Sequence, residues 1–550
     1  MTIPAHERST IPASRLDAIV IGGGVNGSGT FRDLALRGKR VALFEKSDFG
    51  AGTSGASSGM IHGGLRYLLS DPALVRETCL DAGRIRRIAR HLTFRIPFIV
   101  PVAGTGPKAR ILLEGMEWAF SAYDVHAPAK EGMPHARLTA EQALRVEPGL
   151  DPGIAGALTF DEWGIDVHRL CFANVLAGIE VGGRARNHAR VVGIEHVPGD
   201  AGNEPCFRVK ISFDLDRVID VFETRSVVNA AGPWGSSVAA LAGARYRLRP
   251  SRGVHLVFDR RISNFAIASN AVDGRTVYLE PWQNVTIAGC TDDDYYGDPD
   301  YAPVTRDDVG YLVQGIASVF PSIPRYRMIG TWVGVRPTLY DYGPEEEDLS
   351  RSHRIYAHEN VPGLFSIAGG KLAAYRIMSE EAADAVDAFL GRPSPCTTGT
   401  TPLPGAEEEI DARRLADHYR IDAQTLSRIV YRHGSRTRDI LAAMLREPSR
   451  RSPVCRCEPV TDAEIRYALN HEMALTLEDV MRRTRLGTGP CGGTRCALRA
   501  ASIAGEELSW DHSRVLSEAR AFLEARYASR RPALGGAQAR QEACAHDLVR

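Results

Sequence analysis

Residues 17–27 read Asp17-Ala-Ile-Val-Ile21-Gly22-Gly-Gly24-Val-Asn-Gly27, a short apolar run that leads directly into spaced glycines. The apolar run predicts a buried strand, and residues 26–37 predict a helix. Residues 40–45, Arg40-Val-Ala-Leu-Phe-Glu45, predict a second strand. A strand, a helix and a strand in this order form a βαβ unit, which is typical of an α/β fold with a parallel sheet.

The spacing Gly22-x-Gly24-x-x-Gly27 suits a bound pyrophosphate. Glycine allows a tight turn and a close approach of backbone N–H groups, and the helix N-terminus adds partial positive charge. Glu45 lies eighteen residues after Gly27, where a carboxylate accepts hydrogen bonds from an adenosine ribose and disfavours a 2′-phosphate. The loop therefore predicts FAD or NAD rather than NADP, with a glycine-rich turn that binds no ligand as the alternative.

A loop rich in small hydroxyl side chains follows the Glu45 strand and favours FAD. It contains Thr53, Ser54, Ser57 and Ser58 and continues to His62. In many flavoproteins such a loop wraps the FAD pyrophosphate and reaches the flavin, so we expect these residues to bind the cofactor. For His62 two roles stay open, a covalent link to the flavin and packing of the loop beside it. We expect non-covalent FAD.

Composition and charge exclude several classes of protein. A chain of 550 residues suits two to four domains. Lys plus Arg total 67 and Asp plus Glu total 67, a balance that argues against a dedicated nucleic-acid-binding protein. No apolar run approaches the roughly 18–20 residues of a membrane span, and residues 1–15 lack the apolar core of a secretory signal. We therefore expect a cytoplasmic protein that binds no nucleic acid.

Several further motifs resemble flavin-dependent glycerol-3-phosphate dehydrogenases over residues 15–395. They are the Gly22–Gly27 loop, Ser57-Ser-Gly-Met-Ile-His-Gly-Gly-Leu-Arg-Tyr67, Val228-Asn-Ala-Ala-Gly-Pro-Trp234, Gly334-Val-Arg-Pro337 and Gly369-Gly-Lys-Leu-Ala-Ala-Tyr-Arg376. The resemblance implies a glutathione-reductase-like FAD-binding domain, of mixed α/β and α+β class, with an interleaved substrate domain on a mixed sheet. A helical C-terminal domain would follow.

This resemblance implies a division of the chain into segments. We expect a flexible tail over 1–14, an FAD-binding domain over 15–90, 160–245 and 335–395, a substrate domain over 91–159 and 246–334, a linker with helices over 396–450, a helical cysteine-containing part over 451–527 and a loose tail over 528–550.

The resemblance also implies a substrate and the residues that hold it. The substrate would be sn-glycerol 3-phosphate, oxidised to dihydroxyacetone phosphate by hydride transfer from C2 to flavin N5. Its phosphate needs cations, and arginine matches phosphate oxygens and stays charged. Candidate substrate-binding residues are Arg66, Tyr67, Arg336, Arg351 and Lys371. The alternative for any one of these basic residues is a surface charge.

A proton must leave the C2 hydroxyl, and two residues are candidates for that step. His255 lies in Arg252-Gly-Val-His-Leu-Val-Phe258 and can accept a proton near neutral pH, although a buried histidine is more often a core residue. Arg336 can stabilise the alkoxide and share the task. On the cofactor side, Gly232, Gly369, Gly370, Lys371 and Leu372 are expected to line the flavin site, where the helix after Gly370 would stabilise negative charge.

Four cysteines lie close together in the C-terminal part: Cys455, Cys457, Cys491 and Cys496. Four thiolates at this spacing can bind zinc or a [2Fe–2S] cluster. The surrounding sequence resembles the bacterioferritin-associated-ferredoxin-like module in the large flavin subunit of the anaerobic bacterial glycerol-3-phosphate dehydrogenase. This resemblance implies a [2Fe–2S] cluster. Zinc and unmetallated cysteines remain alternatives. We further expect five arginines to surround the cluster with positive charge: Arg456, Arg482, Arg483, Arg485 and Arg495.

The expected electron acceptor is quinone or a partner subunit. Residues 84–110 hold seven Lys or Arg and no Asp or Glu, and the apolar residues Ile111–Leu113, Trp118 and Phe120 follow. A basic stretch beside an apolar helix can dock on anionic lipid, so peripheral contact with the cytoplasmic face of the inner membrane is a further expectation. A solvated basic face is the alternative. Competing functions are oxidation of another polyol phosphate such as erythritol phosphate, an amine or amino-acid oxidase, and an iron–sulfur scaffold.

Overall fold

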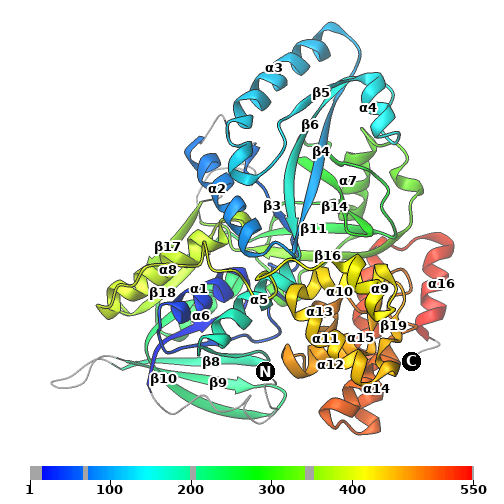
Figure 1. Cartoon of the computed structure of the whole chain (residues 1–550). Coiled ribbons are helices and arrows are strands. Elements are labelled where there is room, and N and C mark those ends of the chain that lie inside the picture. Colours follow the sequence, from blue (N-terminus) through cyan, green and yellow to red (C-terminus); the bar gives the residue numbers. More distant parts are fainter. Residues whose placement is uncertain (1–14, 66–67, 69–71, 198–205, 341–351, 548–550) are drawn as a thin grey trace.

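The computed structural model describes residues 15–65, 68, 72–197, 206–340 and 352–547. Within these residues the chain forms two sheet-containing regions and a third, helical region, shown in yellow to red in Figure 1. The α/β class predicted from the βαβ unit is confirmed.

The first sheet carries the glycine-rich turn. Its strand order is β17-β18-β10-β1-β2-β7, with β9 beside β10 and β8 beside β9, and β1 lies between two parallel partners. All six residues of β1 are buried, and five of them are apolar. The sixth, Asp17, is paired with Arg40 (3.0 Å). The strands are β1 Leu16–Ile21, β2 Val41–Phe44, β7 Arg184–Arg186, β8 Ala189–Val197, β9 Cys206–Phe213, β10 Val218–Asn229, β17 His353–Ala357 and β18 Leu364–Gly369.

The second sheet is mixed, and its strands come from segments that alternate with those of the first. The main order is β15-β11-β14-β13-β12-β4-β6-β3, with β16 beside β11 and β5 beside β6. The strands are β3 Met60–Ile61, β4 Thr93–Ala103, β5 Ala136–Thr139, β6 Ile154–Ile165, β11 Ser251–Phe258, β12 Ala266–Asn270, β13 Thr276–Trp282, β14 Val285–Gly289, β15 Asp293–Asp294 and β16 Met328–Arg336.

Helices cover both sheets. The largest core cluster of the first region joins its strands to α1, α5 and α8, and α7 packs on the second sheet. Their bounds are α1 Val25–Leu36, α2 Pro72–Ile88, α3 Pro107–Asp124, α4 Ala140–Val146, α5 Val167–Glu180, α6 Gly235–Leu241, α7 Arg306–Ala317 and α8 Tyr375–Leu390.

The third region is helical and carries one short hairpin. It contains α9 Ala412–Tyr419, α10 Ala423–His433, α11 Thr437–Arg446, the hairpin β19 Pro453–Cys455 and β20 Val460–Thr461, α12 Asp462–His471, α13 Leu477–Thr484, α14 Ala497–Leu508, α15 His512–Arg530 and α16 Gly536–Asp547. Its cysteines Cys455 and Cys496 are part of its apolar core.

Residues 528–547 differ from the loose tail expected there. They complete α15 and form α16. Two hydrogen bonds connect this segment to β16. Thr331 Oγ1 of β16 donates to the carbonyl oxygen of Ser529 (2.7 Å), and Gln538 Nε2 donates to the carbonyl oxygen of Met328 in β16 (2.7 Å). The sequence is polar here because one side of the segment faces solvent while the other lies against the second sheet.

The third region docks on the first through buried ion pairs. Arg483 of α13 donates both terminal nitrogens to Asp48, at 2.9 and 2.8 Å, and both side chains are fully buried. Arg482 also contacts Asp48 (3.3 Å), and Arg485 pairs with Glu458. Carboxylates therefore neutralise Arg482, Arg483 and Arg485, so these three do not supply the free positive charge expected around the cysteines. For Arg456 and Arg495 the expectation stays a prediction.

Candidate functional site

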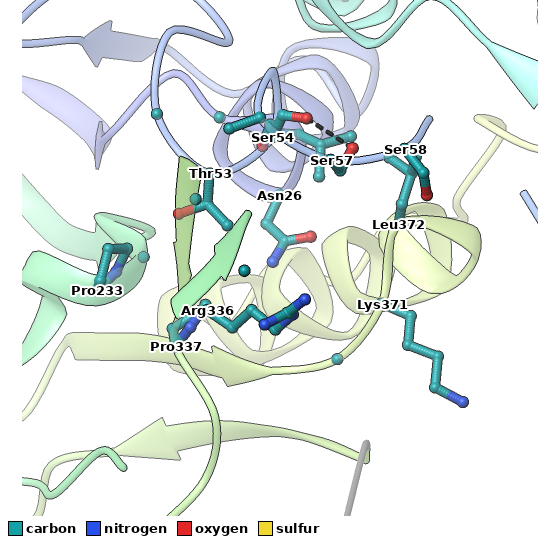
Figure 2. A pocket seen from close by; sticks show the side chains of 18 of the residues that line it. Asn26, Thr53, Ser54, Ser57, Ser58, Pro233, Arg336, Pro337, Lys371 and Leu372 are labelled. Carbon is teal, nitrogen blue, oxygen red and sulfur yellow. Dashed lines mark hydrogen bonds between the residues drawn. The ribbon is translucent and has the colours of Figure 1, made fainter. Parts of the chain in front are cut away.

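A cavity of about 1450 Å³ lies between the two sheets and collects most of the predicted site residues. The glycine-rich turn, the hydroxyl-rich loop and the end of β16 all reach it, as Figure 2 shows for ten of its residues. Predicted residues that line it are Gly22, Gly24, Glu45, Thr53, Ser54, Ser57, Ser58, His62, Gly232, His255, Arg336, Gly369, Gly370, Lys371 and Leu372. Arg66, Tyr67 and Arg351 lie outside the described residues.

The turn after β1 requires its glycines for two different reasons. Gly22 has a φ of +103°, and a Cβ there would lie 2.7 Å from the carbonyl oxygen of Ala230. Gly27 does not line the cavity; a Cβ on it would lie 1.9 Å from the carbonyl oxygen of Gly22. Gly27 therefore lets α1 pack closely on the turn, which aims the helix N-terminus at the cavity.

Glu45 is held in place at the end of β2. Its carboxylate accepts hydrogen bonds from the backbone N–H of Gly23 (2.6 Å) and of Ser47 (2.8 Å). Burial raises the pKa of Glu45, and these two N–H groups oppose that change. The same two bonds fix the carboxylate at the edge of the cavity, in the position from which an acidic residue of such a unit reaches a ribose.

The hydroxyl-rich loop is tied to α1 and to the second sheet. Ser54 Oγ accepts a hydrogen bond from the N–H of Val25 (2.9 Å), in the first turn of α1, and Thr53 Oγ1 donates to Val335 O (2.5 Å) on β16. Ser57 Oγ donates to Ser54 O (2.9 Å), the bond drawn in Figure 2. The loop thus spans from the dinucleotide turn to the strand that carries Arg336.

Polar atoms in the cavity wall lack protein partners, which fits a bound dinucleotide. Asn26 Oδ1, Trp234 Nε1 and His255 Nδ1 are buried without a hydrogen-bond partner among the described residues, and all three residues line the cavity. A Cβ on Gly232 would meet nothing within 4 Å. Because buried polar groups are normally paired, this wall is built to meet a ligand that brings its own donors and acceptors.

The turn after β18 offers fewer N–H groups than the sequence suggests. Gly369 N–H donates to Pro337 O (2.8 Å) and Gly370 N–H donates to Ser352 O (2.9 Å). Both glycines have positive φ values, 71° and 83°. Their N–H groups are used within the protein, so any backbone donors toward a ligand come from the following residues, Lys371 and Leu372.

Arg336 ends β16 and lies over Gly253 of the neighbouring strand, where a Cβ would be 2.4 Å from its Nη2. Its guanidinium donates to Asp292 Oδ1 (3.0 Å) and to Cys290 Sγ (3.0 Å). It also donates to the carbonyl oxygen of Thr291 (3.3 Å). These acceptors hold the group without enclosing it, since the side chain remains 25% exposed. A fixed, permanently charged fork in the cavity suits an anionic substrate.

His255 lies on β11, opposite Gly289 of β14 and Trp332 of β16. A Cβ on Gly289 would lie 2.3 Å from His255 Cδ2, so glycine makes room for the ring. Burial lowers the pKa of His255 to about 3, and Arg336 adds to that change. The imidazole is therefore neutral near pH 7, and the same shift makes it a weaker base than the near-neutral histidine that the sequence led us to expect.

Sequence reasoning missed Glu280, which also lines the cavity. It is 1% exposed, and neither of its carboxylate oxygens has a hydrogen-bond partner within the described chain. The stretch Tyr278-Leu-Glu280-Pro-Trp282 does alternate, and that period places Glu280 on the same face as Tyr278. The alternation was the available signal.

The four clustered cysteines converge as two pairs. Cys457 Sγ lies 3.8 Å from Cys491 Sγ. A hydrogen bond from Cys496, helped by backbone N–H groups, lowers the pKa of Cys455 to about 6, whereas burial raises the pKa of Cys457 to about 11. In the part of the chain that the structure describes, no three His, Cys, Asp or Glu side chains are arranged to hold a single metal ion.

Comparison with known proteins agrees with this architecture. A family model described as FAD dependent oxidoreductase matches residues 17–376, and one described as the C-terminal domain of alpha-glycerophosphate oxidase matches residues 396–515. The chain belongs to the FAD-dependent oxidoreductase family. The family resemblance drawn from the sequence motifs is confirmed at this level.

Individual relatives place the chain more narrowly within that family. One subunit of the anaerobic glycerol-3-phosphate dehydrogenase of Escherichia coli (strain K12) is 34% identical over 495 residues, covering 88% of this chain and 87% of that protein. Its counterpart in the anaerobic enzyme of Haloferax volcanii is 31% identical and covers 96% and 89%. The X-ray structure of a glycerol-3-phosphate dehydrogenase from Bacillus halodurans, complexed with FAD, has a TM-score of 0.73 at 24% identity and covers 95% and 97%. It confirms the fold over nearly the whole chain.

Proposed function

We propose that the protein oxidises sn-glycerol 3-phosphate to dihydroxyacetone phosphate with FAD as the cofactor. The observation that carries the proposal is the shared cavity, in which the dinucleotide turn, Arg336 and the neutral His255 come together. The relatives named glycerol-3-phosphate dehydrogenase support the choice of substrate. FAD bound in this cavity would supply the hydride acceptor for the oxidation.

The residues of the chain supply binding and proton transfer. The turn with Gly22 and Gly24 would hold the pyrophosphate, Gly27 lets α1 pack against that turn, and Glu45 would hold the ribose. Arg336 binds the substrate phosphate or the developing alkoxide, with Lys371 as a second cation. His255 is the proposed acceptor of the hydroxyl proton, because it lines the cavity and one of its ring nitrogens has no protein partner among the described residues. Arg66, Tyr67 and Arg351 remain predicted contacts to the substrate.

The absorbance spectrum of the flavin tests this proposal. Anaerobic addition of glycerol 3-phosphate to purified protein should bleach the oxidised flavin within the time of one turnover. Erythritol phosphate and a panel of amino acids are tested separately as alternative substrates, because they represent oxidation of another polyol phosphate and an amino-acid oxidase. Faster bleaching by erythritol phosphate would identify erythritol phosphate as the better substrate and reject glycerol 3-phosphate. Bleaching by an amino acid alone would reject the polyol phosphate.

We further propose that Cys455, Cys457, Cys491 and Cys496 hold one [2Fe–2S] cluster that passes electrons singly to quinone or a partner subunit. Such a cluster contains two irons, each bound by two protein ligands, and the cysteines lie as two pairs. Chemical analysis should find about two irons and two acid-labile sulfides per chain. Cys544→Ser, at an exposed cysteine, is the matched control and should keep the full content. Zinc in place of iron would reject the cluster.

Peripheral membrane contact is also proposed, on the outer face of α3. No helix in the described part of the chain is both long and apolar enough to cross a membrane. Ile111, Leu112 and Trp118 are exposed, at 72%, 55% and 82%, whereas Leu113 and Phe120 are buried. The exposed three lie beside Lys108 and Arg110, the composition of a helix that lies on anionic lipid.

Vesicle sedimentation tests the membrane proposal. Trp118→Gln should reduce co-sedimentation with phosphatidylglycerol vesicles severalfold, whereas Leu498→Gln, at a 56% exposed leucine of α14, should not. If co-sedimentation falls equally in both variants, or if the unaltered protein does not bind the vesicles, the exposed side of α3 is a solvated face and not a membrane contact.

A further inference from the structure

An ion pair at the rim of the cavity joins the two sheet-containing regions. Lys46, in the loop after β2, donates to both carboxylate oxygens of Asp300, at 2.6 and 2.8 Å. Asp300 belongs to the short 3₁₀ helix Pro299–Tyr301, between β15 and α7. Both residues line the cavity, and their side chains are 22% and 42% exposed. The pair therefore connects the two walls of the cavity at a place that solvent reaches.

The indole of Trp234 holds the lysine in position. Lys46 Nζ lies 3.7 Å from the centre of the Trp234 ring, which is the geometry of a cation–π contact. The ring also packs against Gly52, where a Cβ would lie 3.4 Å from the nearest ring atom. Exposed ion pairs lose much of their strength to the side-chain entropy of ordering a long lysine. Here the ring already restricts the ammonium group, so less entropy is lost when it meets Asp300.

The carboxylate is held by a turn that is fixed to the second sheet. Asp298 Oδ1 accepts a hydrogen bond from the N–H of Asp300 (2.9 Å), and Tyr295 Oη donates to the carbonyl oxygen of Asp298 (3.1 Å). The N–H of Tyr295 donates to the carbonyl oxygen of Pro250 (2.8 Å), the residue before β11. Because both partners are ordered by their own regions, the ion pair restrains the two regions relative to each other.

The pair lies beside the residues expected to hold the nucleotide end of the cofactor. Lys46 directly follows Glu45, whose carboxylate is fixed by the N–H groups of Gly23 and Ser47. Trp234, under the lysine, lines the same cavity, and its Nε1 is buried without a hydrogen-bond partner among the described residues. The ion pair thus spans the rim at the end of the cavity where Glu45 would bind the ribose.

We propose that the Lys46–Asp300 pair closes this end of the cavity behind FAD and must break before FAD can leave. The proposal rests on the cofactor of the proposed function and not on its substrate. Lys46 and Asp300 slow the release of the cofactor and take no part in the oxidation. Their contribution is consequently visible in the rate of FAD release.

The rise in flavin fluorescence after dilution of the holoprotein measures that rate. Lys46→Met loses both the ion pair and the cation–π contact and should release FAD about fivefold faster. Asp300→Asn loses only the charge and should release FAD about twofold faster. Asp216→Asn is the matched control, because the Arg186–Asp216 pair (3.2 Å) is also partly exposed but lies within the first region. This control should release FAD at the rate of the unaltered protein.

Charge reversal and salt distinguish the ion pair from a general loosening of the fold. Lys46→Glu brings two carboxylates together and should speed release further. Adding Asp300→Lys to that variant restores opposite charges and should slow release again. In the unaltered protein release should accelerate as the salt concentration rises, because salt screens an exposed pair, whereas Lys46→Met should show little salt dependence. A double variant that is no slower than Lys46→Glu alone would overturn the proposal.

The outcomes separate the ion pair from the cofactor on which it rests. If the purified protein carries no FAD and binds none when FAD is added, the proposed function fails and the role of the pair fails with it. If FAD is bound but Lys46→Met and Asp300→Asn release it at the unaltered rate, only the role of the pair is overturned. Circular dichroism checks that each variant is folded. Should Lys46→Met not fold, the comparison of Asp300→Asn with Asp216→Asn decides, and equal rates overturn the role.

Discussion

Replacing Arg483 with methionine removes one half of the ion pair that docks the helical region. The arginine makes two hydrogen bonds to Asp48, at 2.9 and 2.8 Å, and neither side chain is exposed. Methionine keeps the length of the side chain but leaves a buried carboxylate behind. Losing one partner of a buried pair costs about 3–5 kcal/mol. Asn187 (3.0 Å) and Arg482 (3.3 Å) still contact Asp48, so we expect the lower end, about 3 kcal/mol.

Urea unfolding, followed by circular dichroism and by flavin release, measures this loss. Arg145→Met is the matched control, because the Arg145–Glu141 pair is 71% and 82% exposed and should contribute about 0.5 kcal/mol or less. The double variant Asp48→Asn with Arg483→Met should recover much of the stability, since it buries no charge. Equal midpoints for Arg483→Met and Arg145→Met would refute the assignment of a stabilising, buried pair.

The pH dependence of the same variant gives a second check. Burial alone would raise the pKa of Asp48, but Arg483 and Arg482 hold it well below its usual range. A carboxyl with a depressed pKa in the folded state contributes stability above its unfolded pKa of about 3.9, and that contribution is lost as the pH falls further. The difference in stability between the unaltered protein and Arg483→Met should therefore be full at pH 7 and shrink below about pH 4.

Three further variants address the site. Arg336→Ala should lower kcat/KM by an amount equivalent to a loss of about 2–4 kcal/mol of transition-state stabilisation. The FAD content, measured after acid release, should stay unchanged. Normal turnover of this variant would show that Arg336 does not act in the site. Gly27→Ala should abolish FAD binding, because its Cβ would lie 1.9 Å from the carbonyl oxygen of Gly22; a yellow, stable variant would contradict the close packing of α1. Cys457→Ser should lose the iron but keep flavin bleaching by substrate in stopped-flow absorbance; loss of bleaching would show that the regions depend on one another.

The parts of the fold that follow from local pattern could be predicted from the sequence. The apolar run at β1, the glycines after it and the helix 26–37 correspond to β1 and α1 within one residue at each boundary. The turn at Gly369–Gly370 also follows from local chemistry, since both glycines have positive φ. Short-range sterics dictate these features, and they are visible in a window of a dozen residues.

Features that depend on distant partners could not be predicted. Arg483 and Arg485 appear in the sequence as free positive charge. In the folded chain Asp48, which lies hundreds of residues earlier, neutralises Arg483, and Glu458 neutralises Arg485. Residues 528–547 appear loose because the face that contacts β16 contributes few apolar residues. Strand alternation places Glu280 on the same face as Tyr278, but only the assembled second sheet shows that this face lines the cavity.

The position of β1 also has a consequence for how the chain is made. This strand lies between β2 and β10, and β10 begins only at Val218. At roughly 5–20 residues per second, a ribosome needs about 10–40 s to add the intervening chain. During that time β1 presents one unpaired apolar edge, the kind of edge that recruits other strands. A nascent chain that stalls before Val218 is therefore a substrate for chaperones, and early arrest should aggregate it far more readily than arrest after β10.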